Sequence, residues 1–112
     1  MSGLARVVVA LAFIASALAP AAAEEMPTIR IEMKDGAITP LRIEVPANKP
    51  FKLEIHNTGK TPGEFESTEL NREKVVAPQS QSFIVFRRLS PGEYVYFDDF
   101  HPEAPKGTLI AK

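Results

Sequence analysis

The chain has 112 residues, of which 45% are hydrophobic and 24% are charged, and its formal net charge is −1 at pH 7. Such a small charge gives no electrostatic case for binding nucleic acid or an anionic membrane surface. The absence of cysteine excludes thiol nucleophiles, zinc–thiolate sites, iron–sulfur clusters and the copper–thiolate bond of a blue copper centre.

The first 23 residues have the features of a secretory signal peptide. Arg6 supplies a positive start, and the apolar run of residues 7–18 is shorter than the roughly 20 residues that span a bilayer. Residues 21–23, all alanine, offer the small side chains of a cleavage site. We therefore expect residues 1–23 to be a signal peptide and residues 24–112 to form a single exported domain.

The rest of the chain alternates apolar and polar residues in short runs bounded by turns, which is typical of β-strands. Residues 28–34 (TIRIEMK) show the pattern best, with Ile29, Ile31 and Met33 on one face. The same alternation recurs in residues 38–45, 51–56, 64–67, 80–87, 92–98 and 108–111. About seven short strands in one small domain predict an all-β fold, a Greek-key β-sandwich.

Three details of this pattern remain open. Pro40 cannot donate a ladder hydrogen bond, so its strand is predicted to lie at a sheet edge or to start after it. Residues 68–74 are compatible with one helical turn capped by Thr68. The register of residues 80–87 is undecided because both faces of that run are apolar.

A carboxylate and an imidazole lie three residues apart where the strand of residues 92–98 ends. Asp98 is in phase with Tyr94 and Tyr96, and His101 follows in a loop flanked by proline. This arrangement is built like a metal-ligand loop, since neutral imidazole suits copper, iron, zinc and nickel. The alternatives are a solvated loop histidine and an aspartate that bonds local backbone N–H groups. Asp99 points to the other face on strict alternation.

Further candidate ligands come from two earlier strands. Glu64 and Glu66 flank Phe65, so the period of two puts both carboxylates on one face and the phenyl ring on the buried one. The alternative is an ordinary solvated strand face. Met33 is either a core residue or a soft ligand for Cu(I). His56 ends its strand on the polar side and is interpreted as a surface residue.

Residues 92–98 (GEYVYFD), His101 and residues 106–109 (KGTL) resemble the C-terminal copper loop of cupredoxins. In that family a Gly-x-Tyr-x-aromatic-x-Cys strand precedes a histidine and a closing Gly-Thr strand. Asp98 stands where the family has cysteine, and the usual axial methionine has no counterpart in this loop. Residues 64–67 (EFES), 69–74 (ELNREK) and 98–102 (DDFHP) further resemble the EfeO-type cupredoxin-like domain, which includes stand-alone FtrB-like proteins of bacterial iron-uptake systems.

The resemblance, which covers essentially residues 24–112, implies a cupredoxin-like sandwich in the periplasm with a site for Cu(II), iron or both. It implies assistance in ferrous-iron oxidation and uptake, either as a ferroxidase component or as a non-enzymatic metal-binding protein. The implied partners are an inner-membrane iron permease and a periplasmic iron-binding protein. The candidate metal ligands are His101, Asp98, Glu66, Met33, Glu64 and Asp99.

Two other functions stay open at this point. One is copper binding or delivery without iron chemistry, although only Met26 and Met33 remain beyond residue 23 to form a thioether site. The other is a metal-free β-sandwich that serves as an interaction module. An open edge of the sandwich would permit a homodimer. No motif indicates an enzyme acting on organic substrates.

Overall fold

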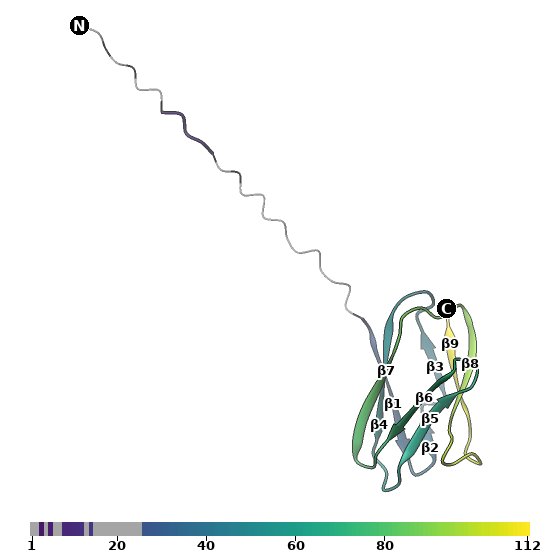
Figure 1. Ribbon diagram of the computed structural model, residues 1–112. Coiled ribbons are helices and arrows are strands. Elements are labelled where there is room, and N and C mark those ends of the chain that lie inside the picture. The colour runs from purple at the N-terminus through teal and green to yellow at the C-terminus, as the bar shows by residue number, and fades with distance from the viewer. Residues whose placement is uncertain (1–2, 4, 6–7, 13, 15–25) are drawn as a thin grey trace.

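The computed structural model describes residues 3, 5, 8–12, 14 and 26–112, which form nine β-strands and no helix. The strands are β1 (Thr28–Lys34), β2 (Ala37–Thr39), β3 (Arg42–Val45), β4 (Phe51–Asn57), β5 (Gly63–Ser67), β6 (Arg72–Val76), β7 (Ser80–Phe86), β8 (Gly92–Asp98) and β9 (Gly107–Ala111). One sheet has the order β2-β1-β4-β7 and the other β3-β9-β8-β5-β6, and the two pack face to face (Figure 1). The predicted all-β sandwich is confirmed.

The predicted signal peptide falls mostly outside the described residues, as does the whole of its expected cleavage site at residues 21–23. In the part of the chain that is described, we find no helix with the length and apolar character needed to cross a membrane.

The strand expected over residues 38–45 is divided between the two sheets. β2 pairs antiparallel with β1, whereas β3 pairs parallel with β9 in the opposite sheet. Pro40, which has no N–H to donate, stands at the crossing, as its chemistry predicts. Leu41, which strict alternation would place on the same face as Ile43 and Val45, is 42% exposed because it belongs to this crossing and to neither strand.

The helical turn considered for residues 68–74 is absent, and its second half is strand β6. The N–H of Asn71 donates to the carbonyl of Thr68 at 3.1 Å, which closes a tight turn, and Asn71 adopts a left-handed φ of 51°. This turn reverses the chain, so that β6 pairs antiparallel with β5. Pairing with the neighbouring strand of the hairpin thus replaces a local helical preference.

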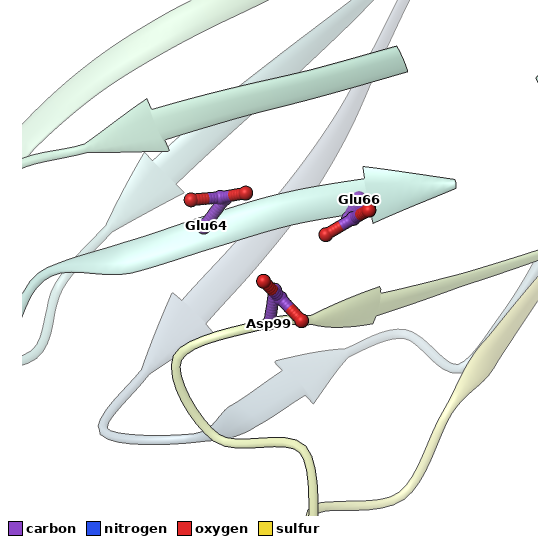
Figure 2. Close-up of side chains that lie close together, drawn as sticks. All are labelled: Glu64, Glu66 and Asp99. Atoms are coloured by element: carbon purple, nitrogen blue, oxygen red, sulfur yellow. The ribbon is translucent and has the colours of Figure 1, made fainter. Parts of the chain in front are cut away.

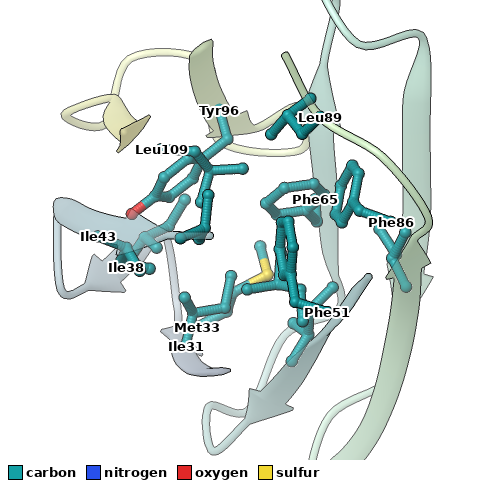
Figure 3. Packing of buried hydrophobic residues seen from close by; sticks show 14 of the residues in the cluster. Ile31, Met33, Ile38, Ile43, Phe51, Phe65, Phe86, Leu89, Tyr96 and Leu109 are labelled. Atoms are coloured by element: carbon teal, nitrogen blue, oxygen red, sulfur yellow. The ribbon is translucent and has the colours of Figure 1, made fainter. Parts of the chain in front are cut away.

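Aromatic side chains from both sheets pack among aliphatic ones in the core (Figure 3). Phe51 stacks on Phe86 with ring centroids 5.0 Å apart, which decides the register of β7 with Phe86 inward and Phe83 outward. Phe65 is fully buried, as predicted, and stacks on Tyr96 at 5.5 Å. These contacts fix β5 and β8 as neighbours beneath the candidate site.

Tyr96 joins the core to the crossing between the sheets. Its hydroxyl donates to the carbonyl of Pro40 at 2.6 Å, and burial raises the pKa of Tyr96 to about 12. On the same strand the hydroxyl of Tyr94 donates to the carbonyl of Ser90 at 2.7 Å. Both hydroxyls therefore have the partners that buried or half-buried tyrosines require.

The ring of Tyr96 lies so close to Gly107 that a Cβ at position 107 would overlap it. We expect Gly107→Ala to lower the free energy of unfolding by about 3 kcal/mol, the upper end of the usual cost of overfilling a packed core. Urea denaturation measures this change. Thr108→Ala, the next residue of β9, is the control and should cost less than about 1 kcal/mol. Equal stability of the two variants would contradict the packing described.

Candidate metal centre

The candidate ligands lie at one end of the sandwich because of how the strands run. β1 and β4 are parallel and in register, with Met33 opposite Asn57, so both strands end at this side. β8 is antiparallel to β5, so Asp98 at the end of β8 pairs with Phe65 in the middle of β5. The turn after β1, the loop after β4 and the loop after β8 consequently gather at one end (Figure 1).

Asp98 is buried, with only 2% of its surface exposed. Its side chain hydrogen-bonds to residues of β5 and of the loop after β8. Its Oδ1 accepts the N–H of Glu64 at 2.9 Å and the N–H of Phe100 at 3.0 Å. Its Oδ2 lies 2.8 Å from Nδ1 of His101. The structure therefore brings the predicted carboxylate and imidazole together, with the carboxylate held in place by two backbone amides.

Met33 reaches the same point from β1. It is 1% exposed and belongs to the buried core, as the core interpretation expects. A Cβ placed on Gly63 would lie 2.8 Å from its Cε, 3.5 Å from its Sδ and 3.4 Å from Oδ2 of Asp98. The absent side chain of Gly63 thus leaves a space that is bordered by the thioether of Met33 and by the carboxylate of Asp98.

Glu64, Glu66 and Asp99 form a second group, which we call the acidic cluster (Figure 2). One carboxylate oxygen of each lies within 4.8 Å of the others. The N–H of Asp99 donates to the carbonyl of Glu64 at 2.9 Å, which ties the two strands at this level. Because neighbouring strand residues point to opposite faces, Asp98 and Phe65 face the core whereas the acidic cluster lies on the outer face of the sheet.

The six predicted ligands are therefore divided between two places and do not form a single group. His101, Asp98 and Met33 meet at the inner end of the sandwich, and Glu64, Glu66 and Asp99 meet on its outer face. Their roles as metal ligands stay predictions.

The acidic cluster repels itself electrostatically. Partial burial raises the pKa of Glu64, and the negative charges of Glu73, Asp99 and Glu66 raise it further. Partial burial also raises the pKa of Glu66, and the negative charges of Asp99 and Glu73 raise it further. Glu73 stands directly opposite Glu66 in the pairing of β5 with β6. Sequence reasoning missed Glu73 because it placed this residue in a helical turn, where it would have no partner on β5.

His56 faces outward from the other sheet, as expected, but is only partly exposed. Its ring hydrogen-bonds to Glu54, two residues earlier on the same face of β4, and this bond lowers the pKa of Glu54. In the described part of the chain, His56 joins neither of the two groups of candidate ligands.

A family model described as the cupredoxin-like domain matches residues 7–111. The chain belongs to the cupredoxin-like domain family. An uncharacterized protein of Rickettsia prowazekii (strain Madrid E) is 40% identical to this cupredoxin-like domain over 82 residues, or 73% of this chain. The match spans 66% of that relative, slightly under two thirds of its length.

Solved structures of copper-binding cupredoxins share the fold at low identity. Reduced auracyanin from Roseiflexus castenholzii has a TM-score of 0.64 and 18% identity, covering 76% of this chain and 96% of that one. The metal-binding domain of the Streptococcus pneumoniae Cu(I)-exporting ATPase CopA, with Cu(I), has a TM-score of 0.63 and 17% identity, covering 76% and 84%. Auracyanin A of Chloroflexus aurantiacus, a "blue" copper protein, has a TM-score of 0.65 and 13% identity, covering 76% and 98%.

The inner donors of this cupredoxin-like domain have a spacing that fits a metal ion. Two ligand atoms about 2.0–2.1 Å from a metal and at right angles to each other are about 2.9 Å apart. Nδ1 of His101 and Oδ2 of Asp98 are 2.8 Å apart. Square-planar or tetragonal nitrogen and oxygen sites suit Cu(II). The 2.8 Å separation is also that of an ordinary N–H···O hydrogen bond, and it is compatible with two adjacent positions on one metal ion.

The raised pKa values of the acidic cluster predict how stability depends on pH in metal-free protein. Both groups titrate above their ordinary value of 4.5 when folded, so their contribution to stability is present below that value and is lost as pH rises through the folded pKa. We expect the double variant Glu64→Gln/Glu66→Gln to melt about 1–4 °C above the wild type at pH 7. The difference should shrink toward pH 4.

Thermal denaturation monitored by circular dichroism at several pH values provides the measurement. Glu93→Gln is the control, because Glu93 is exposed and lies 3.3 Å from the guanidinium of Arg42. That substitution should not raise the melting temperature. Identical melting of the double variant and the wild type at pH 7 would contradict the repulsion inferred for the cluster.

Proposed function

We propose that this protein is a periplasmic metal-binding protein that uses copper and iron and assists the oxidation and uptake of ferrous iron. The observation that carries the proposal is the 2.8 Å pair of Asp98 and His101 at the end of a cupredoxin-like sandwich, with the Met33 thioether beside it. A typical signal-peptide pattern over residues 1–23 supports the periplasmic location.

Copper is the ion that the inner donors fit best. The imidazole of His101, the carboxylate of Asp98 and the sulfur of Met33 together offer nitrogen, oxygen and soft sulfur. Because Asp98 stands where cupredoxins carry a cysteine, a bound copper would lack a thiolate, and the hard oxygen ligand would favour Cu(II) over Cu(I). Copper, when bound there, supplies a mild one-electron acceptor.

Ferrous iron is the substrate proposed for the acidic cluster. The cluster offers only carboxylate oxygens, which favour Fe(III) over Fe(II). They would retain the ion after it gives one electron to a Cu(II) held by the inner donors, which would become Cu(I). Asp98 and Asp99 are consecutive, so one peptide unit links the inner donors to the outer carboxylates. The oxidised ion would then pass to an inner-membrane iron permease and a periplasmic iron-binding protein, the partners that the EfeO-type resemblance implies.

Two substitutions test the inner site. Asp98→Asn keeps an Oδ1 acceptor for the N–H groups of Glu64 and Phe100 but replaces the oxygen beside His101. We expect Asp98→Asn and His101→Ala each to weaken Cu(II) binding more than about 100-fold, since losing merely a hydrogen-bond partner of a ligand costs about 10–100-fold. Titration calorimetry on protein purified without an affinity tag measures the change.

Glu66→Gln is the matched control, and it also tests the iron proposal. It should leave Cu(II) binding unchanged, while anaerobic titration with Fe(II) should lose the metal equivalent that the acidic cluster binds. Copper binding that survives both inner substitutions would refute the inner site. One metal per chain in the wild type, together with unchanged Fe(II) binding by Glu66→Gln, would end the two-metal proposal.

Copper delivery without iron chemistry is the second candidate function, and the placement of Met33 favours it. A thioether stabilises Cu(I), so Met33→Leu should weaken Cu(I) binding about 10-fold while changing Cu(II) affinity less. The substitution conserves volume in the core and should cost less than about 1.5 kcal/mol of stability. Competition with a Cu(I)-specific chromophoric chelator measures the affinity.

Met26→Leu is the control for this experiment, because Met26 is 40% exposed and precedes β1. It should bind Cu(I) like the wild type. If Met33→Leu also binds Cu(I) unchanged, Met33 is a core residue only. A metal-free interaction module remains the third candidate, and it predicts that untagged protein binds neither copper nor iron.

A further inference from the structure

Two contacts hold the imidazole of His101. Asp98 hydrogen-bonds to its Nδ1, and the backbone of Gly36 packs against the ring. A Cβ built on Gly36 would lie 3.1 Å from Cγ of His101 and 3.2 Å from its Cβ and Cδ2. The backbone of Gly36 therefore packs directly on the ring, nearer than almost any side chain would allow. The side chain of His101 keeps 22% of its surface exposed.

Gly36 belongs to a turn whose shape its sequence dictates. Lys34 pairs with Ala37, so the loop between β1 and β2 has two residues, Asp35 and Gly36. Both have positive φ, 47° and 94°. Asp-Gly with two left-handed residues is the favoured two-residue hairpin turn, and it matches the twist of the strands. Glycine at position 36 thus allows the positive φ of the turn and leaves room for the ring of His101.

The carboxylate of Asp35 ties this turn to the loop between β4 and β5. Its Oδ1 accepts the N–H of Lys60 at 2.8 Å, and the N–H and hydroxyl of Thr61, each at 3.0 Å. These hydrogen bonds, the Lys60 amide first, hold the pKa of Asp35 below its ordinary value. Gly59 packs against the same carboxylate, since a Cβ there would lie 2.7 Å from Oδ1.

The contacts form a closed path through three loops that are far apart in sequence. Asp35 holds the loop that contains Thr61, and this loop leads into Glu64, whose N–H binds Asp98. Asp98 holds His101, and His101 packs on Gly36 beside Asp35. A shift of the turn would therefore move the ring relative to the carboxylate with which it is expected to share a metal.

We propose that the Asp35–Gly36 turn is a positioning element for His101: Gly36 sets the tilt of the ring by contact, and Asp35 acts through Gly36 by anchoring the turn to Lys60 and Thr61. The metal-binding consequence rests on the proposed function, whereas the effect on the ring itself does not. None of the three side chains at positions 35, 60 and 61 is needed as a ligand, so the role differs from that of Asp98.

The test removes the anchor without straining the turn. Asp35→Gly deletes the carboxylate and leaves a residue that adopts positive φ freely. Asp35→Asn keeps an oxygen acceptor and tolerates the left-handed conformation. The control is Asn48→Gly, which replaces another residue of positive φ, 57°, in the loop between β3 and β4. Long-range nitrogen–proton NMR of the His101 ring in metal-free protein, and Cu(II) titration with electron paramagnetic resonance, are the two measurements.

We expect Asp35→Gly to shift the His101 ring resonances, weaken Cu(II) binding about 10-fold and alter the copper spectrum. Asp35→Asn should restore affinity to within about 3-fold of the wild type, and Asn48→Gly should change neither measurement. Unchanged ring resonances in a folded Asp35→Gly variant would overturn the positioning role. Wild-type protein that binds no Cu(II), but whose ring resonances respond to Asp35→Gly, would refute the proposed function and leave the positioning role standing.

Discussion

A carboxylate buried inside the sandwich is the group on which this end of the structure depends. Taking a charged carboxylate out of water is costly unless its oxygens are paired. Asp98 meets this demand with two backbone amides on Oδ1 and an imidazole on Oδ2. Those amides belong to Glu64 and Phe100, so the hydrogen bonds to Asp98 also hold the start of β5 and the loop that carries His101. The hydrogen bonds of one buried carboxylate therefore join β5 to the loop after β8 at the candidate centre.

The alternation of the β-strand gives the neighbouring residues different chemistry. Asp98 faces inward, where nitrogen, oxygen and sulfur donors meet, whereas Asp99 faces outward among carboxylates alone. Mixed soft and borderline donors suit copper, and all-oxygen groups suit harder ions such as iron. The fold places the mixed donors on the inner side of β5 and β8 and the carboxylates on the outer side. Two different chemical environments are therefore reached from consecutive residues, Asp98 and Asp99. This division gives the iron and copper parts of the proposed function separate locations.

Two glycines, Gly63 and Gly36, shape the candidate centre because they have no side chain. Gly63 leaves the space in which the Met33 thioether approaches Asp98, and Gly36 lets the backbone lie against the ring of His101. Neither glycine carries a functional group. Each nevertheless decides how closely two functional side chains from distant strands can approach, because a single Cβ would meet heavy atoms at 2.8–3.2 Å.

By itself the sequence determined the fold class, the buried faces of β1, β4 and β5, and the pairing of Asp98 with His101. These follow from local rules: a period of two fixes which residues share a face, and three residues within one loop cannot lie far apart. It also placed Glu64 and Glu66 together and Phe65 inside, for the same reason.

Only the tertiary structure decided which sheet each strand joined, and therefore which donors meet. The division of residues 38–45 between two sheets and the separation of Glu66 from Asp98 depend on contacts between residues distant in the chain. The pairing of Glu73 opposite Glu66 depends on where the hairpin of β5 and β6 turns. Alternation says that two residues face the same way along one strand. It does not say which face of a neighbouring strand lies beside them, because that is set by how the two sheets close over a shared core.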